Sequence, residues 1–159
     1  MKRPLLIGII ALILDQLTKT LVDKFIDYAS SVNVISFLDF FNIVNVRNTG
    51  ASFSMFQGRN SLFALMVFLF LSAVSIWLYK NWNKIRKVQR YAFCLVISGG
   101  LGNLIDRLLR GAVVDFLDFG INSLRWPAFN VADSCIFIAA VIIFVDILMF
   151  SKRQKEEKV

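Results

Sequence analysis

The chain has 159 residues, of which 57% are hydrophobic and 16 are Phe, and its formal net charge is +7. A soluble domain of this length cannot bury that much apolar surface, so the composition indicates a membrane protein. The sequence contains no His, which excludes a Ser-His-Asp triad, a Cys-His pair and an imidazole-ligated metal. Cys94 and Cys135 lack the spacing of a metal or redox motif and are interpreted as small apolar residues. We therefore expect neither a metal nor another cofactor.

Four apolar segments are long enough to cross ~30 Å of hydrocarbon, at roughly residues 4–22, 61–79, 91–109 and 132–150. The first segment lacks a small-x-small cleavage site and contains Asp15 and Lys19, so a retained span is predicted rather than a cleaved signal peptide. The sequence thus predicts a single integral membrane domain over 1–159 that is embedded in the phospholipid bilayer.

Clusters of basic residues set the expected orientation of these spans. Lys and Arg precede the first span, fill the loop between the second and third, and follow the fourth in the tail 151–159. The positive-inside rule then places both termini and the middle loop in the cytoplasm, with segments 23–60 and 110–131 outside. The positive charge is interpreted as a topology signal with some attraction for anionic lipid, and no nucleic acid is expected as a partner. Cys94 and Cys135 fall at opposite membrane depths, so no disulfide is expected between them.

The two outer segments carry strand patterns. Residues 31–46, SVNVISFLDFFNIVNV, are rich in β-branched and aromatic residues, and a second strand pair is predicted from 112–119 with 123–129. The predicted fold class is a membrane all-α bundle of four transmembrane helices with a small extracytoplasmic sheet.

Two acids converge in this topology. Asp115 lies just beyond the outer end of the third span, and Asp133 lies in the first turn of the fourth. Desolvation and mutual repulsion would leave one of two facing carboxyls protonated, so the pair can supply both the acid and the base for amide hydrolysis. The alternative is that Asp133 only satisfies free N–H groups at a helix start and that Asp115 is a solvated loop residue.

Other polar residues lie close to this level of the membrane. Asn103 and Arg107 share one helix face, and Arg107 either pairs with a carboxylate or extends to the interface. Asn48 lies in a predicted turn, RNTGAS, where its amide can bond a substrate backbone or simply shape the turn. Asp106 and Asp118 are close enough in sequence to be confused with the acid pair. The glycines of ISGGLGN are interpreted as helix-packing residues.

In the first span, Asp15 and Lys19 are four residues apart and are interpreted as a structural ion pair. The alternative is that Lys19 is the general base of a Ser-Lys membrane protease. In that mechanism Lys19→Met abolishes activity and changes at the aspartates are milder.

Five motifs in chain order, LDQLTK, RNTGASFS, GNLIDR, VVDF and FNVADS, resemble those of the lipoprotein signal peptidases, or signal peptidase II, over nearly the whole chain. The resemblance implies a bacterial inner-membrane aspartic endopeptidase that removes the signal peptide from diacylglyceryl-modified prolipoproteins, just before the lipidated cysteine. It implies four transmembrane helices with a β-cradle and a short surface helix, inhibition by globomycin-type peptides, and a monomer.

The same resemblance assigns the site residues. Asp115 and Asp133 are the implied catalytic pair, and the supporting residues are Asp15, Lys19, Asn48, Asn103, Arg107 and Asn130. Ser52 after Gly50-Ala51, and Trp126 before Pro127, depart from the usual family pattern and bear on substrate fit rather than on chemistry. A non-enzymatic lipid-binding or ion-conducting protein is a further alternative, but its pathway needs polar residues through the full membrane depth, and the second and fourth spans have almost none.

Overall fold

The computed structural model describes residues 2–35, 40–50 and 59–156. The elements in chain order are α1 (Lys2–Phe25), β1 (Ser31–Asn33), β2 (Phe41–Asn48), α2 (Asn60–Asn81), α3 (Lys87–Leu109), β3 (Val113–Ile121), β4 (Leu124–Arg125) and α4 (Val131–Glu156). All four helices are long and apolar enough to cross a membrane. The helices contain the four apolar segments identified in the sequence, and the fold class is confirmed.

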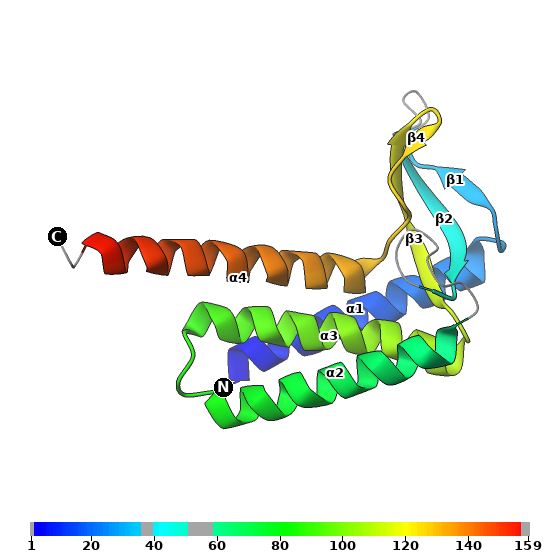
Figure 1. Ribbon diagram of the computed structural model, residues 1–159. Helices are drawn as coiled ribbons and strands as arrows, with labels where there is room; N and C mark the ends of the chain where they lie inside the picture. The colour runs from blue at the N-terminus through cyan, green and yellow to red at the C-terminus, as the bar shows by residue number, and fades with distance from the viewer. Residues whose placement is uncertain (1, 36–39, 51–58, 157–159) are drawn as a thin grey trace.

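The helix α3 lies at the centre of the bundle, where it contacts α1, α2 and α4. Figure 1 shows α2, α3 and α4 side by side with α1 behind them, and the sheet at the end of the bundle away from the N-terminus. Large apolar side chains such as Leu6, Leu69 and Phe137 are exposed on the outer faces of the helices. This pattern suits helices surrounded by hydrocarbon rather than water.

Two glycines allow α3 to approach its neighbours closely. A Cβ added at Gly99 would lie 2.4 Å from the backbone oxygen of Ala132 in α4. A Cβ added at Gly102 would lie 2.4 Å from Asp15 Oδ2 in α1. Both positions therefore exclude any side chain, which agrees with their interpretation as packing residues.

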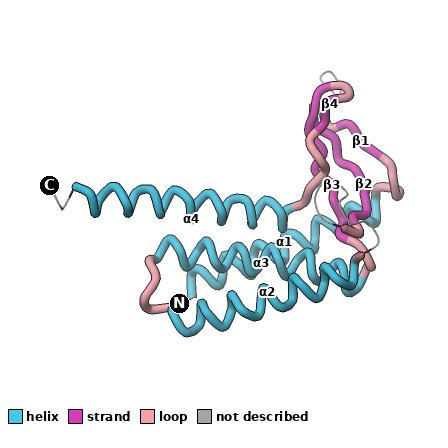
Figure 2. The backbone as a smooth tube through the Cα atoms, viewed as in Figure 1, coloured by secondary structure: helices cyan, strands magenta, loops and turns pink. Residues whose placement is uncertain are grey.

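The sheet has four antiparallel strands in the order β1-β2-β3-β4. Its longest pairing joins β2 to β3, from Phe41 opposite Phe119 to Asn48 opposite Val113. The register shifts between Ile43 and Val46, so β2 contains a bulge next to Val46, the residue that pairs with Asp115 on β3. Figure 2 shows these strands gathered at one end of the helices.

The two strand regions predicted from the sequence are both present, but one prediction was too long. The segment expected at 123–129 forms a strand only at Leu124–Arg125, followed by a single bridge between Phe129 and Leu117. Pro127 has no N–H to donate, which explains why the ladder stops before it. The short surface helix implied by the family is not among the elements of the described ranges, and 36–39 and 51–58 lie outside them.

Both cysteines are buried free thiols. Cys94 packs with Leu78 and Trp82 near the end of the bundle opposite the sheet. Cys135 lies near the start of α4. They serve as small apolar residues at opposite ends of the bundle, as the sequence predicted.

Candidate active site

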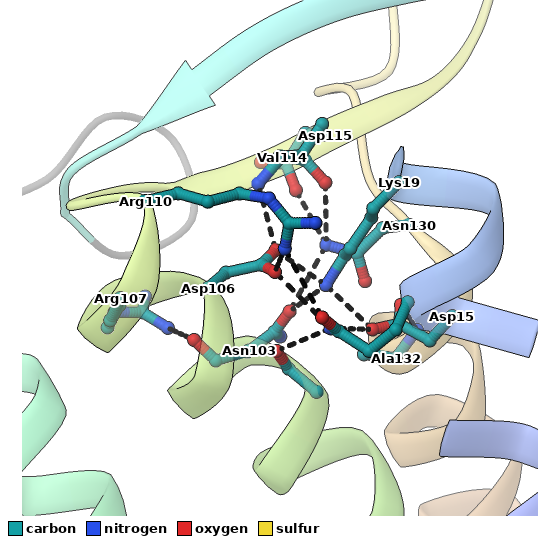
Figure 3. A network of polar contacts seen from close by, with 12 residues as sticks. Asp15, Lys19, Asn103, Asp106, Arg107, Arg110, Val114, Asp115, Asn130 and Ala132 are labelled. Atoms are coloured by element: carbon teal, nitrogen blue, oxygen red, sulfur yellow. Dashed lines mark hydrogen bonds and ion pairs between the residues drawn. The ribbon is translucent and has the colours of Figure 1, made fainter. Parts of the chain in front are cut away.

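Asp115 and Asp133 come together through the side chain of Asn130. Asp115 lies on β3 and Asp133 in the first turn of α4. Asn130 Nδ2 donates to Asp115 Oδ1 at 2.8 Å, and Asn130 Oδ1 accepts the backbone N–H of Asp133 at 2.9 Å. One amide therefore connects the carboxyl group of Asp115 to the backbone of Asp133, and Figure 3 shows Asn130 beside Asp115.

Asp133 combines a helix-capping role with a place in the pair. Its Oδ2 accepts the backbone N–H of Asn130 at 3.2 Å, so the two residues cap the start of α4 reciprocally. Its Oδ1 accepts a hydrogen bond from Asn103 Nδ2 at 2.7 Å. The capping alternative was thus correct in part, but it does not remove the carboxylate from the site, where it remains partly accessible to solvent.

Asp115 is buried, with 4% of its surface exposed, and is not a solvated loop residue. Burial, followed by the negative charge of Asp133, raises the pKa of Asp115 to about 7. Hydrogen bonds from Asn48 Nδ2 at 3.1 Å and from Asn130 oppose this rise. The site therefore holds a carboxyl that is substantially protonated close to neutral pH.

Lys19 lies at the centre of a buried ion cluster behind the pair. Its Nζ is 2.9 Å from Asp15 Oδ2 and 2.9 Å from Asp106 Oδ2, and all three side chains are at most 1% exposed. It also donates to Asn103 Oδ1 at 3.0 Å. The predicted ion pair of Asp15 and Lys19 is present, and Asp106 completes it.

The same cluster argues against Lys19 as a general base. An ammonium group has three donors, and those of Lys19 all point at oxygen acceptors in Asp15, Asp106 and Asn103. Within the described residues, no Ser hydroxyl hydrogen-bonds Lys19. Ser98 and Ser134 instead donate to backbone carbonyls at 2.7 Å and 2.9 Å.

The two carboxylates of the cluster also hold the backbone next to each acid of the pair. Asp15 Oδ1 accepts the N–H of Ala132, which precedes Asp133, at 2.8 Å. Asp106 Oδ2 accepts the N–H of Val114, which precedes Asp115, at 3.2 Å. Figure 3 shows the carboxylates of Asp15 and Asp106 on the Lys19 ammonium group, with Ala132 and Val114 beside them.

An outer layer of polar contacts surrounds the cluster, and the sequence did not predict it. Arg110 pairs with Asp106 and with Asp23, and Arg47 pairs with Asp23 at 2.6 Å. Gln16 Nε2 donates to Asp15, Asp106 and the carbonyl of Gly102. The only sequence signal was the spacing of Asp106 and Arg110, four residues apart at the end of α3.

Among the described residues Arg107 forms no ion pair with a carboxylate, so that expectation for it was wrong. Its guanidinium donates to the backbone oxygens of Gly50 at 3.0 Å and Asn103 at 3.3 Å. The turn after β2 is closed by Asn48 Oδ1, which accepts the N–H of Gly50 at 3.0 Å. Arg107 therefore fixes the turn that presents Asn48 to the pair.

The other nearby acids are excluded as members of the pair. Asp118 binds Arg125 at 2.8 Å on the sheet. Asp106 is fully engaged by Lys19, Arg110 and Val114. Among the described residues, no group of His, Cys, Asp or Glu has the arrangement of a metal site.

These features define a multi-helix membrane protein with a bridged acid pair at one end of its bundle. The family model described as signal peptidase (SPase) II matches residues 7–149. The lipoprotein signal peptidase of Alteromonas mediterranea is 40% identical over 158 residues, which cover 98% of this chain and 85% of that protein. That of Thermodesulfovibrio yellowstonii is 39% identical over 135 residues, covering 82% and 84%.

A solved bacterial membrane enzyme has the same fold, with a TM-score of 0.86 and 32% identity over 100% of this chain and 95% of that one. A second solved bacterial membrane enzyme gives a TM-score of 0.77 at 31% identity, over 93% of this chain and 94% of that one. The chain belongs to the signal peptidase II family. It is accordingly a membrane protein and a protease of the lipoprotein signal peptidase type.

Proposed function

We propose that this protein is an aspartic endopeptidase that removes signal peptides from diacylglyceryl-modified prolipoproteins, cutting just before the lipidated cysteine. The observation that carries the proposal is the bridging of Asp115 and Asp133 by Asn130, with Asp115 buried and its pKa raised to about 7. The membership of the signal peptidase II family supports the substrate class.

In the proposed reaction the pair holds one proton. The carboxylate of Asp133 is partly exposed and takes a proton from a water molecule, whose oxygen attacks the scissile carbonyl carbon. The carboxylic acid of Asp115 protonates the carbonyl oxygen. The tetrahedral intermediate then collapses, and the proton on Asp133 passes to the leaving amine. One hydroxyl of the intermediate returns its proton to Asp115 as the C–N bond breaks, so both carboxyls are back in their starting states when the acid and amine products leave.

The position of the pair suits a lipid-anchored substrate. The pair lies where α3 ends and α4 begins, at the boundary between apolar helices and the polar sheet. A signal helix spans the bilayer, and acyl chains hold its cysteine at the interface, so the scissile bond is expected at this depth. The basic residues gathered at the other end of the helices favour cytoplasmic termini and an active site on the outer face of the bacterial inner membrane.

Cleavage by purified protein in detergent tests this function. The substrates are a diacylglyceryl-modified prolipoprotein and its unmodified precursor, and the enzymes are the wild type, Asp115→Asn and Asp133→Asn. Asp118→Asn is the matched control, because it removes a carboxylate from the same strand but outside the pair. We expect cleavage of the modified substrate only, with a loss of at least about 100-fold in both pair variants. Near-normal turnover by either of them would overturn the aspartic mechanism.

The remaining expectations extend this proposal. Globomycin-type peptides are expected to compete with the lipid-modified substrate for the pair, and one chain is expected to suffice for activity. A Ser-Lys mechanism has no observation in its favour, because the Lys19 ammonium donates all its hydrogens to Asp15, Asp106 and Asn103.

A further inference from the structure

The end of the bundle opposite the acid pair contains a hollow of about 370 Å³. It is formed by the first turn of α1, the start of α3 and Trp82 just after α2. Figure 1 shows that α1 and α3 both begin at this end, away from the sheet. With α3 rising about 1.5 Å per residue, the hollow lies on the order of 30 Å from the pair.

Among the residues that the structure describes, four cations line the hollow and no acid does. The cations are Lys2 and Arg3 from α1, and Lys87 and Arg90 from α3. Neither helix has an acidic residue in its first turn, so the positive ends of two helix dipoles meet the four side chains without compensation. Within the described part of the chain, none of the four forms an ion pair with a carboxylate.

Several other cations of the described residues do have an acidic partner. The described arginines at 47, 86, 110 and 125 each pair with an aspartate, and so does Lys19. Even Arg86, directly before α3, turns toward Asp146 of α4, 2.6 Å away. The hollow therefore gathers four cations that have no acidic partner among the described residues.

Arg90 provides an independent sign of a missing acceptor. Its guanidinium lies over the ring of Trp82, 5.5 Å from the centroid, and its Nη2 donates to the carbonyl of Ile85 at 3.2 Å. Its Nε is buried without a hydrogen-bond acceptor among the described residues. A buried donor of this kind costs free energy unless an acceptor reaches it.

We propose that this hollow binds the headgroup phosphate of an anionic phospholipid. A phosphate diester supplies the acceptor oxygens and negative charge that the four cations and Arg90 Nε lack. The walls are largely apolar, with Trp82, Tyr91 and Pro4 beside the charges, which suits the glycerol and upper acyl region of a lipid. Aromatic rings and basic residues at a helix end are also the usual composition of an interfacial lipid site. The site is separate from the acid pair and does not depend on the proposed reaction.

Lipid retention by the purified protein, measured by native mass spectrometry, tests the proposal. The variant is the double substitution Lys2→Gln/Lys87→Gln, because both side chains are exposed and make no ion pair within the described residues. Lys80→Gln/Lys84→Gln is the matched control, since it removes two positive charges from the same end but outside the hollow. The probes are phosphatidylglycerol, cardiolipin, phosphatidylcholine and inorganic phosphate.

We expect the wild type and the control pair to retain the two anionic lipids in preference to phosphatidylcholine, and the Lys2/Lys87 variant to bind them about 30-fold more weakly. The same lipids should raise the Tm of the wild type more than that of the variant. An equal loss of anionic-lipid binding in both double variants would mean a general effect of charge and would overturn the proposed lipid site. Displacement of the lipid by millimolar inorganic phosphate would identify free phosphate as the ligand instead and would overturn the assignment to lipid.

Discussion

Asp15 and Asp106 share one ammonium group, that of Lys19, and each also accepts a backbone N–H next to one acid of the pair. The buried cluster thereby connects α1 and α3 to the start of α4 and to β3. A site whose acids come from a strand and a helix needs such a common support, because neither element alone fixes the other. The arrangement makes the cluster a positioning device for Asp115 and Asp133.

Removal of the cation is expected to destabilise the protein. Lys19→Met leaves Asp15 and Asp106 buried without a counter-charge, which costs about 3–5 kcal/mol. Thermal unfolding in detergent should therefore show a markedly lower Tm for Lys19→Met, together with lost cleavage. Asp115→Asn, in contrast, should lose cleavage without losing stability. If Lys19→Met unfolds like the wild type yet is inactive, Lys19 takes part in the chemistry and the Ser-Lys mechanism returns.

The stability of the protein should depend on pH through Asp115. Burial raises the pKa of this carboxyl to about 7, above the value near 4 of an unfolded chain. Between these values the folded state binds more protons than the unfolded state, so the contribution is fully present below about pH 4 and is lost as the pH rises through about 7.

Thermal unfolding at about pH 5 and about pH 8 measures this contribution. The Tm of Asp115→Asn, relative to the wild type, should rise between the lower and the higher pH, because Asn has no proton to lose. Asp118→Asn is the control, since Asp118 is paired with Arg125 outside the site. A constant difference between Asp115→Asn and the wild type would contradict the raised pKa.

Much of this fold could be predicted from local patterns. The lengths of the apolar segments determine the helices, and the spacing of Asp15 and Lys19 determines their ion pair. Topology alone placed Asp115 and Asp133 at the same end. These features depend on residues close in sequence or on membrane depth, which is why the sequence suffices for them.

Contacts that depend on tertiary packing could not be predicted. The pairing of β2 with β3 joins segments more than sixty residues apart, from Phe41 opposite Phe119, and no local pattern specifies it. Arg107 lies on the predicted face of α3, but its guanidinium donates to the backbone oxygen of Gly50 and not to an acid. The third member of the ion cluster, Asp106, could not be told from the acid pair in the sequence, because its contacts come from α1, α3 and β3 together.

The pH dependence of cleavage should respond to Asn48. Its Nδ2 donates to Asp115 Oδ2 at 3.1 Å, and this hydrogen bond lowers the pKa of Asp115. In the wild type we expect the rate to fall as the pH rises through about 7, when the pair loses its proton. Asn48→Ala should move this fall in rate to higher pH, because ionised Asp115 loses a hydrogen-bond donor.

Rates of Asn48→Ala across the pH range, beside those of Asn60→Ala, provide the measurement. Asn60 donates to the carbonyl of Arg107 at 3.0 Å and makes no hydrogen bond to either acid among the described contacts. The rate of Asn60→Ala should therefore fall at the same pH as that of the wild type. If the rate of Asn48→Ala falls at the same pH as in the wild type, or at a lower pH, Asn48 does not lower the pKa of Asp115.

Gly102→Ala tests the close approach of α3 to the cluster. The new Cβ would lie 2.4 Å from Asp15 Oδ2 and 3.2 Å from the Cβ of Ala132, so Asp15 must move away from Lys19 and from the N–H of Ala132. We expect a loss of about 1–3 kcal/mol in stability and a fall in cleavage beyond what that loss explains, since Asp133 follows Ala132 directly. Gly111→Ala is the control: its Cβ meets nothing within 4 Å, but φ is +74°, so about 1 kcal/mol should be lost with cleavage retained. Equal effects of the two variants on cleavage would mean that the packing of Asp15 against α3 does not position the pair.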